Sequence, residues 1–234
     1  MDQGRKISVV IPAAGSGKRM KSGRNKVYLK LLGKTVLERT VEAFERNPRV
    51  DRIIVVVGRE EVDYCKRQIL KPEEHPRLTD IIPGGAERCH SVYEALKLLD
   101  ETDIVLVHDG ARPLVDDEII DRCIEGVQKW GCCAAGVPVK DTIKIVKEGY
   151  VAATPERSSL FAMHTPQAFF AGFLRDAVRQ GIEAGFFGTD EAVFAEKVGK
   201  KVFIVESKYD NIKLTTSDDL TIAEAILMKR EEQE

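Results

Sequence analysis

The sequence lacks several features that would assign a chain to a functional class at once. Its five cysteines are odd in number and form no C-x-x-C pair, which argues against both a disulfide framework and a zinc site. Its four histidines are too scattered to form a metal-binding set. A formal net charge of -2 argues against extensive nucleic-acid binding, although local basic clusters could still surround a phosphorylated small molecule.

Long apolar runs are also absent, so no segment could span a membrane and no membrane association is expected. Residues 1–6 are polar, and the apolar run that follows them is too short for a signal peptide. The cysteine usage favours a reducing compartment, so we expect a cytoplasmic protein. Since neither repeats nor linkers interrupt the chain, residues 1–234 are expected to form a single domain with a substantial core.

The sequence does contain a regular alternation of apolar runs and amphipathic segments. The runs at 53–57, 104–107, 134–139 and 202–205, like the one that begins at Ile7, predict buried strands. Apolar residues at helical spacing predict the helices between them. Strands linked in this way indicate an α/β protein with a Rossmann-like, doubly wound, mostly parallel sheet. The helical faces are Leu37/Val41/Phe44, Val92/Leu96/Leu99, Ile120/Ile124/Val127 and Leu220/Ala223/Leu227.

Residues 140–157 depart from this alternation and predict a β-hairpin arm. Two short strands, 142–146 and 150–153, flank Lys147-Glu148-Gly149, and Glu-Gly between alternating runs favours a hairpin turn. A two-stranded ribbon is only marginally stable when isolated. We therefore expect the arm to protrude and to pack on a second subunit, with packing on its own subunit as the alternative.

A phosphate-binding loop is predicted directly after the first strand. The small residues 13–17 allow the backbone to approach a ligand closely, and amides at the following helix start would form an anion site. Lys18 and Arg19 would add full charges. The loop matches neither the Walker pattern nor the dinucleotide fingerprint, because Arg19 follows Gly17-Lys18 and Met20 occupies the last position. The alternative is a tight strand-to-helix turn with a solvated basic pair.

A second block, residues 105–113, brings His108 and Asp109 to the carboxyl end of a predicted strand, where open α/β sheets bind ligands. Asp109, followed by Gly110, is a suitable ligand for a Mg²⁺ ion that nucleotide phosphates also bind. Arg112 can bind two oxygens of a phosphate through two N–H groups of its guanidinium. The alternatives are that Asp109 caps the next turn and that Arg112 makes a surface ion pair. A histidine at a strand end is more often structural than functional.

Three further motifs are weaker on their own. The loop that contains Gly84 and Gly85 feeds a helix expected to begin near Ser91, where amides and a hydroxyl could read a base edge. An equally good interpretation is a Gly-Gly turn with Ser91 as N-cap. Residues 188–191 predict a helix N-terminus, and the segment around Lys213 lies between a strand and the last helix. Thr216 or Ser217 is expected to cap that helix.

Taken together and in this order, the motifs resemble the 2-C-methyl-D-erythritol 4-phosphate cytidylyltransferase family of the non-mevalonate isoprenoid pathway. The resemblance covers nearly the whole chain, through P-A-A-G-S-G-K-R-M, R-N-K, G-G-A-E-R-C-H-S-V, V-H-D-G-A-R-P, V-K-D-T-I-K, T-P-Q-A-F, T-D-E-A and D-N-I-K-L-T. It implies in-line attack of the methylerythritol phosphate on the α-phosphorus of CTP, which gives a cytidine diphosphate product and pyrophosphate. It also implies a Mg²⁺ cofactor and a homodimer that shares its active sites through the arm.

The resemblance further implies roles for individual residues. The catalytic cations would be Arg19, Lys26 and Lys213, and Asp109 would lie near Mg²⁺. The expected nucleotide-binding residues are Pro12, Ala13, Ala14, Gly15, Ser16, Gly17, Lys18, Arg19, Lys26, Gly84, Gly85, Ala86, Ser91, Asp109, Gly110 and Lys213. The expected residues for the second substrate are Asp109, Arg112, Thr142, Arg157, Thr165, Thr189 and Lys213, with Thr142 and Arg157 supplied by the neighbouring subunit.

Two alternative functions share these features. Ribitol-5-phosphate cytidylyltransferases resemble this chain in the nucleotide loop and in T-P-Q, but they typically read H-D-A-V-R-P, whereas this chain has H-D-G-A-R-P and E-R-S-S-L. A non-catalytic nucleotide-binding protein of the same fold is the other alternative. The presence of Arg19, Lys26, Asp109 and Lys213 argues against it. Three positions depart from the family pattern without removing a cation: Val27, Ala86 and Gly110.

Overall fold

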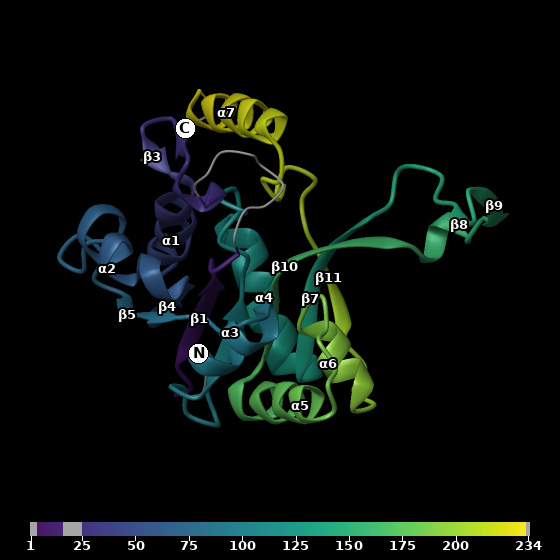
Figure 1. Cartoon of the computed structure of the whole chain (residues 1–234), viewed down its shortest axis with the longest axis horizontal. Coiled ribbons are helices and arrows are strands. Elements are labelled where there is room, and N and C mark those ends of the chain that lie inside the picture. Colours follow the sequence, from purple (N-terminus) through teal and green to yellow (C-terminus); the bar gives the residue numbers. More distant parts are fainter. Residues whose placement is uncertain (1–3, 16–24, 233–234) are drawn as a thin grey trace.

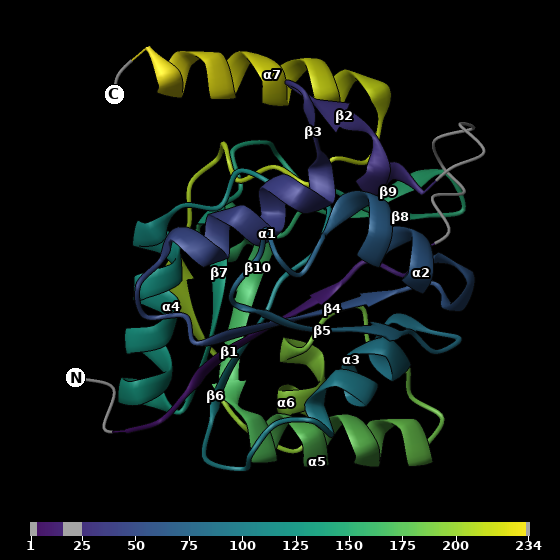
Figure 2. The same cartoon turned by 90° about the vertical axis from the view of Figure 1, so that its left-hand side faces the viewer.

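A seven-stranded sheet with helices on both faces forms the centre of the molecule (Figures 1 and 2). The computed structural model describes residues 4–15 and 25–232. The strand order is β11-β7-β10-β6-β1-β4-β5, and β10 alone runs antiparallel to its neighbours β6 and β7. The predicted mostly parallel, doubly wound sheet is therefore confirmed. The strands are β1 (Ile7–Pro12), β4 (Arg52–Val57), β5 (Leu78–Pro83), β6 (Ile104–Val107), β7 (Cys132–Pro138), β10 (Phe161–Phe170) and β11 (Phe203–Glu206).

The sheet divides the apolar side chains between two cores. Successive residues of a strand point to opposite faces, so Val9 belongs to one core and Val10 to the other. The first core is covered by α1 (Val36–Arg46) and α4 (Asp117–Trp130). The second is covered by α3 (Arg88–Leu96), α5 (Ala171–Glu183) and α6 (Ala192–Lys197). Because both faces are buried, the parallel strands are continuous apolar runs, as the sequence predicts.

A third layer covers one end of the first core. Helix α7 (Ser217–Glu231) packs through Ala223 on Leu31, Val36 and Leu114, and it lies over α1 in Figure 2. Thr216 caps α7, as expected from the sequence. The remaining short elements are η2 (Lys26–Tyr28), β2 (Lys30–Leu31), β3 (Lys34–Thr35), η3 (Arg59–Glu61), α2 (Val62–Tyr64), η4 (Cys65–Ile69) and η5 (Arg157–Ser159). No helix in the described ranges has both the length and the apolar character needed to cross a membrane.

The predicted start of the helix near Ser91 is wrong by one turn. Helix α3 begins at Arg88, and Glu87 is its N-cap, with its amide donating a hydrogen bond of 3.3 Å to His90 Nδ1. The Ser91 hydroxyl instead accepts a hydrogen bond from the Gly85 amide at 3.2 Å. The helix therefore brings Arg88 into the region where the sequence predicts ligand contacts.

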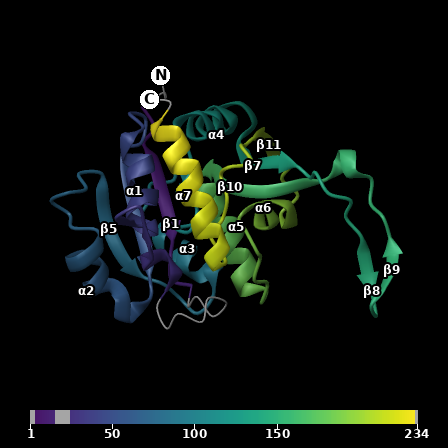
Figure 3. The ribbon, with the colours of Figure 1, turned by 90° about the horizontal axis from the view of Figure 1, so that it is seen from above.

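The hairpin arm extends away from the sheet, as Figures 1 and 3 show. Its strands are β8 (Ile145–Lys147), which is shorter than predicted, and β9 (Tyr150–Ala153), which has the predicted bounds. Glu148 and Gly149 form the turn with φ angles of 51° and 85°, which fit the mirror-image turns that connect hairpins. Residues 141–154 are all exposed, so the arm does not bury its apolar side chains on its own subunit.

Candidate active site

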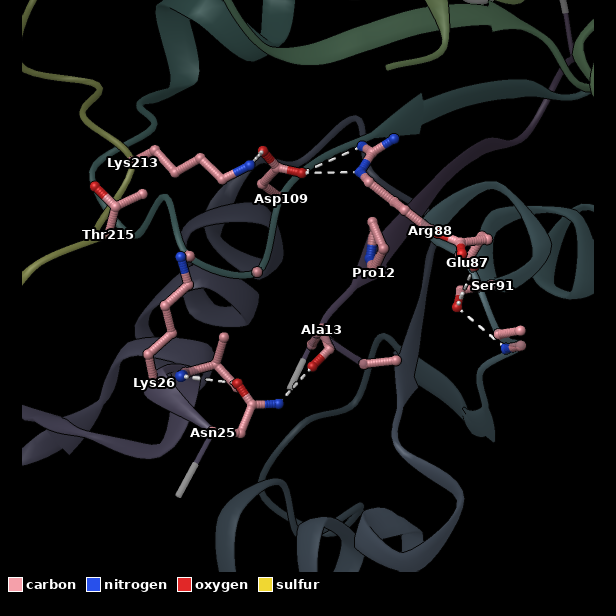
Figure 4. Close-up of a pocket in the computed structure, with 17 residues that line it drawn as sticks. Pro12, Ala13, Asn25, Lys26, Glu87, Arg88, Ser91, Asp109, Lys213 and Thr215 are labelled. Atoms are coloured by element: carbon pink, nitrogen blue, oxygen red, sulfur yellow. Dashed lines mark hydrogen bonds and ion pairs between the residues drawn. The ribbon is translucent and has the colours of Figure 1, made fainter. Parts of the chain in front are cut away.

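A cavity of about 500 Å³ opens where the carboxyl ends of β1, β5 and β6 meet (Figure 4). The loops that follow these strands line it together with the segment before α7. It thus collects residues from across the chain at the edge where open parallel sheets bind ligands. The predicted nucleotide-binding residues that line it are Pro12, Ala13, Ala14, Gly15, Lys26, Gly85, Ala86, Ser91, Asp109, Gly110 and Lys213. Ser16, Gly17, Lys18 and the predicted catalytic Arg19 lie outside the described residues.

Asp109 is a buried carboxylate in the wall of this cavity. Lys213 Nζ lies 2.6 Å from Oδ2, and Arg88 approaches Oδ1 at 3.2 Å through Nη2 and at 3.3 Å through Nε. Burial by itself would raise the pKa of Asp109. The positive charges of Arg88 and Lys213 outweigh it and hold the pKa well below its ordinary value. The carboxylate is therefore ionised at any pH at which the protein would work.

Lys26 is brought to the cavity by a connection between two segments. Asn25 precedes the short helix η2, and its Nδ2 donates a hydrogen bond of 2.8 Å to the carbonyl of Ala13, just after β1. Its Oδ1 accepts a bond from the amide of Val27 at 3.4 Å. In Figure 4, Lys26 and Lys213 extend on one side of the cavity, whereas Arg88 and Ser91 lie on the other. The two lysines make one side of the cavity cationic, whereas Arg88, Glu87 and the Ser91 hydroxyl line the other side.

The glycines of the second loop are required by close packing. A Cβ at Gly84 would lie 2.6 Å from Ser91 Oγ, and one at Gly85 would lie 2.4 Å from the Cβ of His90. Gly84 does not itself line the cavity, but it packs directly on Ser91 and Ala14, which do. The Gly85 amide donates a hydrogen bond to the Ser91 hydroxyl, and both residues line the cavity wall. A nucleobase bound there could form hydrogen bonds to these two groups in place of the bond between them.

His108 is a buried residue that contacts the backbone and side chains next to Asp109. It is fully buried, and burial lowers its pKa to about 4, so the ring is neutral at neutral pH. Its Nε2 lies 3.0 Å from the Arg112 carbonyl and its Nδ1 3.1 Å from Thr165 Oγ1. Thr165 Oγ1 also accepts a bond of 3.1 Å from the Asp109 amide. The structural interpretation of the strand-end histidine is confirmed.

The residues predicted for the second substrate are brought together only in part within one chain. Lys213, Thr165 and Arg112 lie next to Asp109, at 2.6, 3.1 and 3.9 Å from its side chain or amide. Arg112 is only 8% exposed, so the surface ion pair considered for it is wrong; it donates to the carbonyls of Asn211 and Met163 at 2.7 and 3.3 Å. Thr189 is exposed. Thr142 and Arg157 are exposed on the arm, and Arg157 donates to the Lys140 carbonyl at 3.1 Å. Their roles toward a ligand, like that of the buried Thr165, stay predictions.

The sequence interpretation missed Arg88 and Glu191 as site residues. Both stand inside motifs that drew attention for other reasons, Arg88 in G-G-A-E-R for its glycines and Glu191 in T-D-E-A as a helix start. Their side chains form an ion pair of 2.5 Å, although they are 103 residues apart. A charged residue beside a predicted ligand loop was the available signal for Arg88.

The described residues contain no cluster of three or more side chains that could hold a metal ion by themselves. Asp109 nevertheless fits the way in which Mg²⁺ binds beside a nucleotide, through one carboxylate with phosphates and water as the other ligands. The donor set therefore agrees with a metal that arrives with its substrate.

Comparisons with known proteins agree with this geometry. The family model for 2-C-methyl-D-erythritol 4-phosphate cytidylyltransferase matches residues 7–229. A curated protein of that name from Bacillus velezensis is 47% identical over 220 residues, which cover 94% of each chain. One from Syntrophotalea carbinolica is 43% identical over 223 residues, covering 94% of this chain and 96% of the relative.

Solved structures give the same result. A 4-diphosphocytidyl-2C-methyl-D-erythritol synthase from Anaerococcus prevotii superposes with a TM-score of 0.85 at 32% identity, covering 97% of both chains. The Francisella tularensis 2-C-methyl-D-erythritol 4-phosphate cytidylyltransferase superposes with a TM-score of 0.80 at 32% identity, covering 93% of this chain and 98% of that one. Sequence and fold are thus both similar, over nearly the whole chain, to proteins of one family.

Proposed function

The chain belongs to the 2-C-methyl-D-erythritol 4-phosphate cytidylyltransferase family, and we propose that it transfers the cytidylyl group of CTP to 2-C-methyl-D-erythritol 4-phosphate. The products are 4-diphosphocytidyl-2-C-methyl-D-erythritol and pyrophosphate, a step of isoprenoid synthesis. The observation that carries the proposal is the cavity at the end of the sheet. Lys26, Lys213 and Asp109 line it together with the uncharged groups of Gly85 and Ser91.

The reaction needs charge stabilisation more than a base. A phosphate oxygen of the acceptor attacks the α-phosphorus of CTP, and the bond from that phosphorus to the oxygen bridging to the β-phosphate breaks as pyrophosphate leaves. The acceptor phosphate is already anionic at neutral pH, so no side chain has to remove a proton. Lys26 and Lys213 would stabilise the charge that builds up on the phosphoryl oxygens. His108 is fully buried and both of its ring nitrogens are hydrogen-bonded within the protein, so it is not placed to act as a base toward a ligand in the cavity.

A divalent cation would be held by Asp109 together with the triphosphate. When bound, Mg²⁺ would neutralise phosphate charge and fix the conformation of the triphosphate. Asp109 is ionised and lies in the cavity wall, so it can serve as the protein's ligand. Lys213, which now pairs with Asp109, would turn toward the phosphates when the nucleotide binds.

The acceptor site would be completed by a second copy of the chain. Tyr150 is 80% exposed and Val151 62% exposed on the arm, and a soluble monomer gains nothing from such a surface. In the homodimer that we propose, the arm packs on the partner and brings the partner subunit's Thr142 and Arg157 to the acceptor phosphate. This arrangement explains why these two residues lie far from their own cavity.

We also expect the protein to work in the reducing cytoplasm. All five cysteines are free and buried, so no disulfide contributes to the fold. Buried thiols packed as small apolar side chains are typical of proteins from a reducing compartment.

The experiment is pyrophosphate release from CTP and Mg²⁺ with no acceptor, with 2-C-methyl-D-erythritol 4-phosphate, or with ribitol 5-phosphate. Of the three reactions, we expect only the one with 2-C-methyl-D-erythritol 4-phosphate to release pyrophosphate. Faster turnover of ribitol 5-phosphate would assign the chain to the other cytidylyltransferase activity. CTP binding without pyrophosphate release on any acceptor would indicate a non-catalytic nucleotide-binding protein.

A further inference from the structure

Arg88 connects two carboxylates, Asp109 and Glu191, that are far apart in the sequence. Its Nη1 and Nη2 atoms lie 2.5 and 3.0 Å from the two oxygens of Glu191, which is bidentate ion pairing. Its Nε and Nη2 face Oδ1 of Asp109 at 3.3 and 3.2 Å, and Figure 4 shows this side of the guanidinium turned to Asp109. One planar group thus holds the cavity carboxylate with one edge and Glu191 with the other.

Glu191 is itself held in a single orientation. Its side chain is 1% exposed, and it directly precedes α6. Gln167 of β10 accepts hydrogen bonds from the amides of Glu191 and Ala192 at 3.0 and 2.9 Å through Oε1. Gln167 Nε2 donates to Asp190 Oδ2 at 2.8 Å. Because the backbone of this turn is fixed, the Glu191 carboxylate is a rigid support for the guanidinium.

We propose that Arg88, locked by Glu191, is a positioning residue that fixes the orientation of the Asp109 carboxylate. With Oδ1 bound to Arg88, Oδ2 is the oxygen turned to Lys213 and left for exchange with a ligand. The inference rests on the proposed function, in which Asp109 would hold the metal ion. A misplacement of about 1 Å at a reacting site can cost about a hundredfold in rate.

Lysine cannot replace Arg88 in this role. It keeps the positive charge, but its ammonium is a point donor and cannot present two edges to two carboxylates. Arg88→Lys therefore tests geometry at constant charge. Arg175→Lys is the matched control, because Arg175 is also an arginine paired with a glutamate, Glu101 at 3.0 Å, and that glutamate is exposed on the surface.

The first measurement is kcat/KM for the acceptor at saturating CTP and Mg²⁺. We expect Arg88→Lys to lower it about 10–100-fold and Arg175→Lys to leave it unchanged. Glu191→Gln, a neutral variant of the same shape, is a second test, and it should lower kcat/KM while Arg88 keeps its charge. Circular dichroism and thermal melting identify the folded fraction to which each rate refers. Unchanged kcat/KM in folded Arg88→Lys and Glu191→Gln would overturn the proposal.

The second measurement asks whether Arg88 acts through Asp109. Arg88→Lys is made in an Asp109→Asn background, where we expect less than about a threefold further loss, because residues that act as a unit are not additive. An equal loss in both backgrounds would contradict the proposal and indicate a separate structural role. If turnover of Asp109→Asn is too slow, the dissociation constant of CTP with Mg²⁺ gives the same four-protein comparison. Inactive wild-type and Arg175→Lys proteins would instead contradict the proposed function itself.

Discussion

The cavity and the arm differ in whether their side chains find partners within the same chain. In the cavity, Asp109 and Lys213 are held by partners from the same chain, at distances of 2.6 to 3.3 Å. On the arm, Thr142 and Arg157 are exposed, and the apolar residues around them are exposed as well. In the proposed function, one chain would therefore supply the side chains of the cavity, whereas the acceptor site would need the arm of a second chain.

The largest effect should come from the cationic side of the cavity. Lys213→Ala removes a charge that faces the phosphates in the proposed reaction, so kcat should fall about 10²–10³-fold, the scale for loss of one transition-state stabiliser. Pyrophosphate release at saturating substrates measures it. The matched control is Lys71→Ala, which removes an exposed lysine paired with Glu74 at 2.7 Å and should leave kcat unchanged. Similar kcat values for the two variants would mean that the cavity is not the reaction site.

The next effect concerns the buried support of the cavity and has no counterpart on the arm. The folded pKa of His108 is about 4, below its ordinary value of 6.5, so the unfolded chain binds more protons between these pH values. The free energy of unfolding should therefore fall as the pH drops through this window, by about 3 kcal/mol in total from this one group. Urea unfolding at several pH values measures the fall.

His108→Gln can keep the donor to the Arg112 carbonyl but does not titrate, so its stability should depend less on pH between about 6.5 and 4. His75→Gln is the contrasting variant. Hydrogen bonding to Glu45 raises the pKa of His75 against the opposing effect of burial, so protonated His75 stabilises the fold at low pH and this contribution is lost as the pH rises. If His108→Gln kept the wild-type pH dependence, the histidine would not be neutral in the folded protein.

The smallest effect should come from the arm. Arg157→Ala should raise KM for the acceptor about 10–100-fold, the scale of a hydrogen bond to a charged group, with a smaller change in kcat. Initial rates over a range of acceptor concentrations separate the two. This change is expected even though Arg157 lies outside its own cavity.

Mixing the two variants sharpens the comparison. In a heterodimer of Lys213→Ala and Arg157→Ala chains, one of the two sites would combine an intact cavity with an intact arm. Refolded mixtures should therefore regain activity that neither variant has alone. Proven heterodimers without regained activity would mean that each arm serves its own subunit.

The sequence predicts best what local chemistry determines. The apolar runs at β1, β4 and β6 are buried on both faces, so their composition identifies them as strands. Strands β5 and β10 escape that rule. Thr79 and Asp80 interrupt the first, and His164 to Gln167 interrupt the second, where Thr165 accepts from the Asp109 amide and Gln167 from the Glu191 amide. Polar residues within these two strands thus hid them from a search for apolar runs.

Site residues that a single motif identifies could be predicted from the sequence. Contacts between side chains of two separate motifs could not. Asp109 at a strand end and Lys213 before the last helix were both expected, and both line the cavity. The contact between Arg88 and Glu191 depends on the packing of α3 beside α5 and α6, which no periodicity in the chain specifies. Likewise, the helix start at Glu87, one turn before Ser91, includes a contact from the Glu87 amide to the His90 side chain, which residue spacing alone does not specify.

The ion pair between Arg88 and Glu191 also has a consequence for the evolution of the chain. Loss of Arg88 alone would leave the buried Glu191 carboxylate without its counter-charge, at a cost of about 3–5 kcal/mol, which is a large share of the stability of an ordinary domain. Loss of Glu191 alone would still leave Arg88 paired with Asp109. The constraint is therefore unequal: among related sequences, an acidic residue at position 191 should rarely be kept where the arginine at position 88 is lost.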